Sequence, residues 1–303
     1  AAACKAVYSG SIPDSASNNK FMKIGIVGYG FVGKAIEAGI RDNVKLIKID
    51  PKLNTSIKEL DKFCPDIIFV CVPTPMNDDN SQDISILNDV SEELAQLDSN
   101  PLFVIKSTVL PNYIKNIEIK LKRIVYNPEF LREKHANNDF INSKFIIFGG
   151  KKKFCSELEL FYRKNTNCIS EEYIYTDLIS ASLMKYAINS FLATKVIFFN
   201  EMNKLFKLSG AEDSWEKFIE SIANDTRIGN SHMNVPGHDG RLGFGGACFP
   251  KDISALENYA DSLGISLNIL KSVISTNNNI RGKYNNATNR EADQNINFLK
   301  GDS

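Results

Sequence analysis

The feature that most constrains the fold of this chain is a glycine-rich turn between a short apolar stretch and a helix-like pattern, KIGIVGYGFVG. Gly28, Gly30 and Gly33 form G-x-G-x-x-G, with Phe31 and Val32 inside it. This spacing serves a tight turn, close approach of a pyrophosphate, and packing of the helix on the strand. The phosphate would lie at the helix N-terminus. The pattern predicts a dinucleotide-binding unit that begins at Met22.

A second expected strand, Val44–Ile49, ends in Asp50. A carboxylate about 20 residues past the glycines hydrogen-bonds a ribose hydroxyl and disfavours a 2′-phosphate. Asp50 therefore favours NAD over NADP, although Lys52 nearby leaves NADP open. A turn residue at a strand end is the alternative interpretation of Asp50.

Strand-like and helix-like segments alternate after Asp50. The expected strands are residues 66–72, 102–106 and 124–126, and the expected helices are residues 84–96 and 112–121. Such alternation predicts an α/β fold, a Rossmann-type doubly wound parallel sheet with ligands at the carboxyl ends of its strands.

The composition narrows the class of protein. Lys plus Arg and Asp plus Glu both number 36, so nothing indicates nucleic acid or a membrane surface as partner. No apolar run approaches the roughly 20 residues of a membrane span. Six cysteines without paired spacing and three histidines give no metal pattern. Free thiols predict a reducing cytoplasm.

Two strand ends carry notable residues. Pro73 and Thr74 form part of a stiff loop over the expected cofactor crevice. Lys106-Ser107-Thr108 presents hydroxyls where a nicotinamide would lie. Generic loops would look similar, so the residues alone leave both assignments open.

The segment NPEFLRE follows the next strand. Its acids, Glu129 and Glu133, are four residues apart and share one face if the segment is helical. In a cleft, one of them could serve as a base. An ordinary salt-bridged loop is the alternative. The run Lys151–Lys153 indicates a solvated face.

From Thr176 a long helical pattern continues until Gly210 closes it. Lys185 and Asn189 share one face of this helix and suit an oxyanion or a sugar hydroxyl. Snorkelling at the core edge is the alternative for Lys185. A further helix is expected over residues 214–222, and the long loop after it carries Arg227, which can clamp a phosphate or carboxylate.

The most reactive stretch is GFGGACFPKD, residues 243–252. Its glycines allow a close backbone approach to a ligand. Ser254 and Glu257 resemble a capping box that opens a helix over residues 253–263. Cys248 would then lie near the positive end of a helix and beside Lys251, and both favour the thiolate form. A small buried cysteine in a turn is the alternative.

A last helix is expected over residues 267–280, and from Asn277 onward the polar, asparagine-rich composition predicts a stretch that does not pack. The expected organisation has four parts. They are a disordered tail over residues 1–21, an NAD-binding domain over 22–175, a helical central and dimerisation domain over 176–281, and a polar tail over 282–303.

These motifs together resemble the UDP-glucose 6-dehydrogenase family of nucleotide-sugar dehydrogenases. GFGGACFPKD, NPEFLRE, Pro-Thr-Pro, Ser-Thr-Val and Arg-Ile-Gly all match, over roughly Met22 to Tyr284. The sequence departs from the family at Lys134, at Asn142-Ser143-Lys144, and in lacking the second α/β domain that holds much of the UDP. The resemblance therefore implies a short form or a truncated chain.

The resemblance implies roles for individual residues. Catalysis is implied for Cys248, Lys185, Asn189, Asp252, Glu129 and Thr108. NAD contacts are implied for Gly28, Gly30, Phe31, Val32, Gly33, Asp50, Pro73, Thr74, Thr108 and Lys251. Substrate contacts are implied for Glu129, Phe130, Leu131, Glu133, Lys185, Asn189, Arg227, Phe244 and Gly245. No metal is implied, and the assembly expected is a homodimer in which Arg227 reaches the neighbouring subunit's substrate.

The implied reaction is the NAD-dependent, two-step oxidation of UDP-glucose to UDP-glucuronate through a thioester on Cys248, with Glu129 assisting hydrolysis. GDP-mannose or UDP-N-acetylmannosamine are alternative substrates, although Phe-Pro-Lys-Asp after the cysteine favours UDP-glucose. A single-step hydroxy-acid dehydrogenase has no use for Cys248. A non-catalytic NAD-binding dimerisation partner is the alternative from another class.

Overall fold

The structure is a computed structural model that describes residues 21–284 and 286–298. The chain separates into two compact units. The first contains Ile84–Lys185 and the chain up to Thr74; the second contains Pro75–Asp83 and the chain from Tyr186 onward. The tail predicted over residues 1–21 lies, except for Phe21, outside the described residues.

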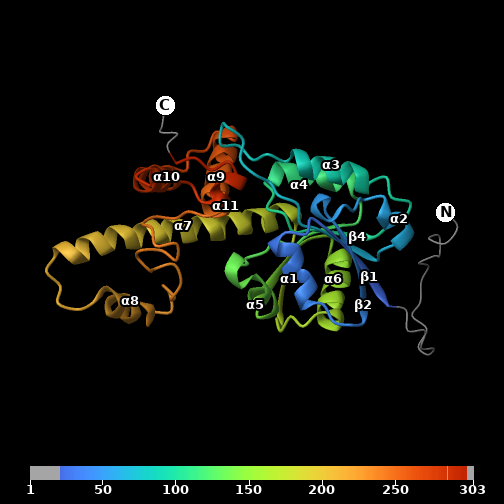
Figure 1. Ribbon diagram of the computed structural model, residues 1–303, viewed down its shortest axis with the longest axis horizontal. Helices are drawn as coiled ribbons and strands as arrows, with labels where there is room; N and C mark the ends of the chain where they lie inside the picture. The colour runs from blue at the N-terminus through green and yellow to red at the C-terminus, as the bar shows by residue number, and fades with distance from the viewer. Residues whose placement is uncertain (1–20, 285, 299–303) are drawn as a thin grey trace. The chain divides into compact units, whose positions relative to one another are not determined.

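The first unit is built on a seven-stranded sheet (Figure 1). Its strands are β1 (Met22–Val27), β2 (Val44–Ile49), β3 (Ile67–Val70), β4 (Leu102–Ile105), β5 (Ile124–Tyr126), β6 (Phe145–Gly150) and β7 (Glu172–Thr176). The order is β2-β1-β3-β4-β5-β6-β7, and every neighbouring pair is parallel except β5 and β6. The predicted doubly wound α/β fold is confirmed.

Helices cover both faces of this sheet, which is why its central strands are apolar on both sides. The helices are α1 (Phe31–Gly39), α2 (Glu59–Phe63), α3 (Ser85–Leu94), α4 (Pro111–Lys120), α5 (Ala136–Ile141) and α6 (Lys152–Asn165), with 3-10 turns η1 (Pro51–Leu53) and η2 (Glu133–His135). Residues of α2, α3 and α4 share one core cluster, and residues of α1, α5 and α6 share the other (Figure 1).

The sequence analysis did not predict α2, α5, β6, α6 or β7. β6 is antiparallel to β5, whereas a parallel sheet was expected, and β7 has the partly polar sequence EYIYT. The predicted solvated face at Lys151–Lys153 is confirmed, since all three side chains are exposed.

The second unit is helical. The long α7 (Leu178–Leu208) begins in the first unit and contributes its residues from Tyr186 onward to the second. The others are α8 (Trp215–Ala223), α9 (Phe249–Ser262), α10 (Asn268–Arg281) and α11 (Asn289–Asp293). Gly210 follows α7 with φ +76°, a left-handed conformation that ends a helix. The predicted long helix and its glycine stop are therefore confirmed.

Two predictions for the second unit are wrong, one on the start of a helix and one on packing. Helix α9 begins at Phe249, with Cys248 as N-cap and Pro250 in its first turn, so Ser254 is inside the helix and does not cap it. Proline is well tolerated in a first turn, which lets the helix begin four residues earlier. The chain beyond Asn277 also packs: Glu291 is fully buried and Ile296 is buried. The capping box Thr288–Glu291 makes this possible, because it satisfies polar groups internally.

The cysteines differ from expectation at one position. Cys71, Cys155, Cys168 and Cys248 are free thiols, whereas Cys64 is disulfide-bonded. The inference of a reducing compartment from free thiols therefore loses part of its support.

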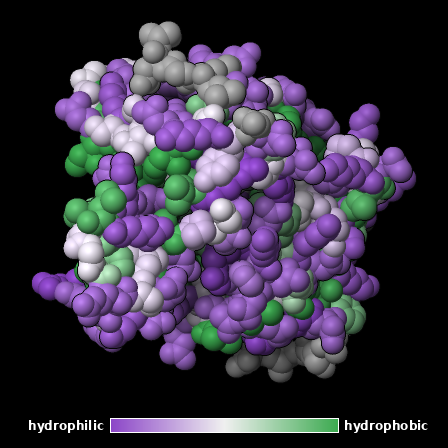
Figure 2. Space-filling model, turned by 60° about the vertical axis from the view of Figure 1, so that its left-hand side comes forward, coloured by the Kyte–Doolittle hydropathy of each residue, from purple (hydrophilic) through white to green (hydrophobic). Residues whose placement is uncertain are grey.

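On the face shown in Figure 2, hydrophilic residues dominate and hydrophobic ones gather in separate groups. None of the helices described is long and apolar enough to cross a membrane. Residues 21–284 and 286–298 contain no cluster of three or more His, Cys, Asp or Glu that could hold a metal ion.

Candidate active site

The glycine turn lies where β1 meets α1. Gly28 has φ +89°, and a Cβ there would lie 2.7 Å from the backbone of Cys71. Gly33 packs so closely on the carbonyl oxygen of Gly28 that it has no room for a Cβ either. Apart from its own chain neighbours, Gly30 has no atom of the described residues within 4 Å of where its Cβ would be. Two glycines thus close the turn and the third leaves an open position in front of α1.

The start of α1 is suited to a pyrophosphate. The N-cap residue, Gly30, provides no capping side chain, and the first turn contains no acid, so the positive end of the helix dipole favours an anion here. Asp50 lies at the end of β2, where its carboxylate accepts hydrogen bonds from the Tyr29 and Lys52 amides at 2.7 and 2.8 Å. These residues fit the diphosphate and a ribose of NAD.

A buried polar cluster occupies the ends of β4 and β5. We call Lys106, Asn127, Glu129 and Lys185 the strand-end cluster; all four are buried. Lys106 Nζ donates to Asn127 Oδ1 at 3.0 Å. Lys185 Nζ donates to the backbone oxygen of Glu129 and lies 3.4 Å from its carboxylate. The cluster therefore holds two amines around one carboxylate.

Burial shapes the ionisation of this cluster. It lowers the pKa of Lys106 to about 8, although the nearby Glu129 opposes the shift. It also raises the pKa of the adjacent Cys71 thiol to about 12, so that thiol is inert. Lys185 Nζ lies 5.0 Å from the centre of the Phe130 ring, which adds a cation–π contact.

Neighbouring loops of the first unit are closely tied. Thr74 Oγ1 donates to the backbone oxygen of Thr108 at 3.0 Å, so the predicted Pro-Thr-Pro and Ser-Thr-Val loops are in contact. Pro73 is exposed. The condition under which Glu129 and Glu133 would share one helical face is not met. Glu129 lies in a non-helical segment and accepts from the Leu131 amide at 2.6 Å, whereas Glu133 is exposed on η2.

The second unit contains what we call the helix-start cluster: Asn189, Cys248, Lys251 and Asp252. Lys251 and Asp252 lie in the first turn of α9 and are both buried. Asp252 accepts from Lys251 Nζ and from Asn189 Nδ2, both at 2.6 Å. The Lys251 ammonium is therefore paired with Asp252, and Cys248 is the partly exposed residue at the helix start.

Two further predicted residues differ in burial. Arg227 is exposed and its guanidinium pairs with Asp225. Phe244 is buried, and its amide and carbonyl both bond the Asn277 side chain, at 2.8 and 3.0 Å. Asn277 thus anchors the glycine loop from α10.

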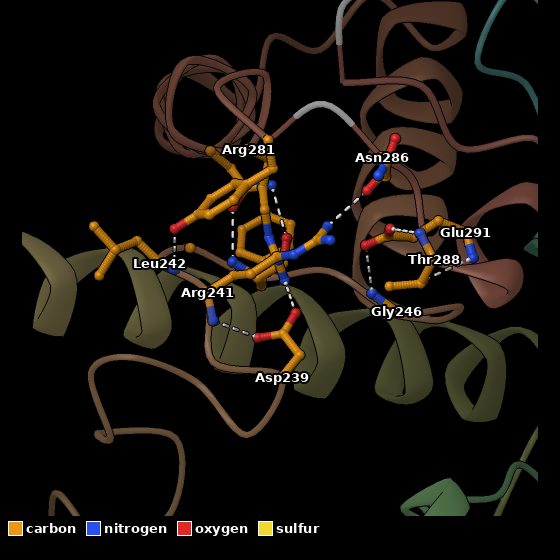
Figure 3. Close-up of polar contacts among 12 residues, drawn as sticks. Asp239, Arg241, Leu242, Gly246, Arg281, Asn286, Thr288 and Glu291 are labelled. Carbon is orange, nitrogen blue, oxygen red and sulfur yellow. Dashed lines mark hydrogen bonds and ion pairs between the residues drawn. The ribbon is translucent and has the colours of Figure 1, made fainter.

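The sequence analysis missed several residues. Lys106 directly precedes the Ser-Thr-Val motif, but only the neighbouring hydroxyl residues were proposed as site residues. Arg281 and Glu291 lie beside the glycine loop, where Glu291 accepts from the Gly246 amide (Figure 3). Only the Thr288–Glu291 spacing of a capping box signalled order in this polar stretch.

Two family models match the chain. The NAD binding domain of the UDP-glucose/GDP-mannose dehydrogenase family matches residues 36–165. The central domain of the same family matches residues 179–279. Together the matches cover most of the chain.

Individual relatives agree with these models. The UDP-glucose 6-dehydrogenase of Rickettsia felis is 38% identical over 220 residues, 69% of this chain and 47% of that protein. The UDP-glucose 6-dehydrogenase of Rickettsia prowazekii is 33% identical over 280 residues, which cover 82% of this chain and 62% of that protein. A solved UDP-glucose dehydrogenase from Pyrobaculum islandicum has a TM-score of 0.71 and 25% identity, covering 88% of this chain and 70% of that one. This chain spans roughly half to three-fifths of the length of the two Rickettsia relatives.

Proposed function

Because the chain belongs to the UDP-glucose/GDP-mannose dehydrogenase family, we propose that it oxidises a nucleotide sugar, UDP-glucose in the first instance, to the corresponding uronic acid. Both oxidation steps require a hydride acceptor, which NAD supplies when bound at the glycine turn. The proposal concerns the whole reaction, from alcohol to acid.

One observation carries the proposal most directly. Cys248 is the N-cap of α9, and the first turn of that helix contains the buried pair Lys251–Asp252. A helix start favours an anion, so it favours the nucleophilic thiolate. A dehydrogenase that stops at the first oxidation needs no nucleophile at all, whereas oxidation of an aldehyde to an acid uses one.

The proposed roles follow the chemistry of each group. The Cys248 thiolate adds to the aldehyde carbon, and the resulting thiohemiacetal is oxidised to a thioester. Water then attacks the thioester carbon with Glu129 assisting as a base, which releases the acid and the thiol. Lys185 and Asn189 would stabilise the oxyanions, and Asp252 with Thr108 would handle protons and hold the water.

The stoichiometry of the reaction tests this proposal. A limiting amount of UDP-glucose is incubated with the protein and excess NAD, and NADH is measured at the end point. We expect two NADH per sugar. One NADH per sugar would contradict the thioester step, and none, with NAD still bound, would support a non-catalytic chain. GDP-mannose and UDP-N-acetylmannosamine in the same assay decide the substrate.

We also propose that the chain forms a homodimer along α7. Met184, Phe191, Phe198 and Leu205 are spaced seven residues apart on this helix, and all four are exposed. A heptad-spaced apolar stripe suits helix-to-helix contact with a second copy. Arg227, exposed after α8, would then reach the substrate of the neighbouring subunit.

Sedimentation tests the dimer. The double variant Phe191→Glu/Phe198→Glu should sediment as a monomer, because it buries two charges in the seam. Leu160→Glu, on α6 and outside the stripe, is the matched control and should leave the wild-type state unchanged. A double variant that stays dimeric would refute the stripe as the interface.

A further inference from the structure

A stretch near the C-terminus packs on the glycine loop that precedes Cys248. We call residues 286–298 the cover segment. Glu291, in its short helix α11, places Oε1 3.1 Å from the Gly246 amide, to which it is hydrogen-bonded (Figure 3). Its Oε2 accepts from the Thr288 amide at 2.7 Å, and the side chain has no solvent exposure. A buried carboxylate therefore occupies a backbone donor of the loop.

Three more contacts hold the cover segment within the second unit. Arg241 Nη1 donates to the backbone oxygen of Asn286 at 2.8 Å (Figure 3). The Met76 amide donates to the Gln294 oxygen at 3.2 Å, and Asn295 Nδ2 donates to the Met76 oxygen at 3.2 Å. The segment is thus attached on both sides of Glu291.

The surroundings of Glu291 have the donors that an anion site needs. Arg281 is buried, and its Nη2 donates to Asp239 at 2.7 Å. Its Nε and Nη1 are buried and have no hydrogen-bond partner within the described part of the chain. A Cβ on Gly245 would overlap both the Arg281 guanidinium and the Glu291 carboxylate, so the loop passes directly over these two groups. Backbone amides beside a buried guanidinium are a common setting for phosphate or carboxylate.

We propose that the cover segment is an autoinhibitory element, in which Glu291 takes the loop donor that an anionic group of the substrate would otherwise use. The proposal rests on the proposed function, because it takes the glycine loop as the place where the nucleotide sugar binds. The segment must leave the loop before the ligand enters.

This arrangement has a quantitative consequence. If only a fraction of the molecules is open, the apparent dissociation constant is the intrinsic one divided by that fraction. Removing Glu291 loses a charge-assisted hydrogen bond and so favours the open state. The affinity for an anionic nucleotide should therefore rise when Glu291 is removed.

The variants Glu291→Ala and Asp293→Ala test the proposal in the full chain. Asp293 is an exposed acid on the same short helix and serves as the matched control. Calorimetry with UDP-glucose and with UDP should show an affinity about tenfold higher for Glu291→Ala and unchanged for Asp293→Ala. Tryptic cleavage after Arg290 should accelerate in Glu291→Ala, and in the wild type on addition of UDP-glucose.

A second variant weakens the cover segment at another residue, so that the test does not depend on whether Glu291→Ala folds. Asn295→Ala removes the side-chain hydrogen bonds to the Met76 oxygen and to Asp78 and leaves Glu291 intact. It should therefore also raise the affinity, by a smaller factor. Equal affinity in the wild type, Glu291→Ala and Asn295→Ala would overturn the proposal.

Failure of the proposed function has a different signature. If neither UDP-glucose nor UDP binds to any variant, the nucleotide sugar is the wrong ligand. The cover is then judged by alkylation of Cys248 with iodoacetamide, which reports on the loop two residues from Gly246. Faster alkylation in Glu291→Ala than in Asp293→Ala supports the cover, and equal rates overturn it.

Discussion

The charged side chains of the strand-end cluster and of the helix-start cluster are buried, but their charges are balanced differently. In the first, Lys106 and Lys185 accompany a single carboxylate, and Lys106 satisfies its ammonium with an amide oxygen. In the second, one ammonium and one carboxylate are adjacent in sequence and bonded to each other at 2.6 Å. One cluster has an excess of amines and the other is a closed pair.

The difference shows that burial can have two effects: it can shift the pKa of a charged group, or it can hold a structural element in place through a buried ion pair. An ammonium without an ionic partner of its own is disfavoured by desolvation, which accounts for the lowered pKa of Lys106. The Lys251–Asp252 pair satisfies itself and also holds Asn189, so its main effect is to fix the start of α9. We infer that the strand-end cluster responds to pH, while the helix-start cluster positions the thiol.

The largest effect is expected for Cys248→Ser. A serine hydroxyl is a much poorer nucleophile than a thiolate, so NADH turnover with UDP-glucose should fall by at least about 10⁴-fold. Cys168→Ala, which removes another free and partly exposed thiol, is the control and should retain activity. Full turnover in Cys248→Ser would show that Cys248 is not the nucleophile of the reaction.

A large loss of stability is expected for Asp252→Ala. It leaves Lys251 buried without its partner, which typically costs about 3–5 kcal/mol of unfolding free energy. Asp261→Ala, on the same helix, breaks an exposed contact to Lys271 and should cost less than about 1 kcal/mol. Urea unfolding measures both. Similar losses in the two variants would contradict the closed, buried pair.

The pH dependence of stability tests the strand-end cluster. The folded pKa of Lys106 is about 8, below its ordinary value of 10.5, so the unfolded chain binds more protons between these values. Lys106 therefore destabilises the fold at pH 7, and this penalty is lost as the pH rises from about 8 towards 10.5. Relative to Lys106→Met, the wild type should gain about 2–3 kcal/mol between pH 7 and pH 10.5. A constant difference across this range would contradict the lowered pKa of the buried Lys106 ammonium.

The smallest effect is expected for Gly30→Ala. The added methyl meets no protein atom within 4 Å, so the melting temperature should stay unchanged. It would lie where the pyrophosphate approaches, so NAD affinity measured by calorimetry should fall about tenfold, equivalent to about 1.4 kcal/mol. Unchanged NAD affinity would show that the cofactor does not pass over this turn.

Much of the fold could be predicted because its signals are local. β2 and β5 have the predicted bounds, and Gly210 ends α7 as expected. The errors arose where local rules competed. Ser254 and Glu257 have capping-box spacing, but Pro250 allows α9 to begin at Phe249. The polar composition after Asn277 predicted no packing, yet the Thr288–Glu291 box and the Gly246 contact bury Glu291.

The site shows the same division. The glycine turn, Cys248 and the Lys185–Asn189 pair could be predicted from the sequence. Each depends on the types and spacing of residues that are close together along the chain. The sequence by itself therefore determined the fold class, the dinucleotide turn and the candidate thiol. Only the tertiary structure decided that Lys106 bonds an amide oxygen, that Lys251 is paired with Asp252, and that Glu291 covers the glycine loop. These depend on burial and on contacts between distant residues, which set desolvation and hydrogen bonding and which sequence spacing does not encode.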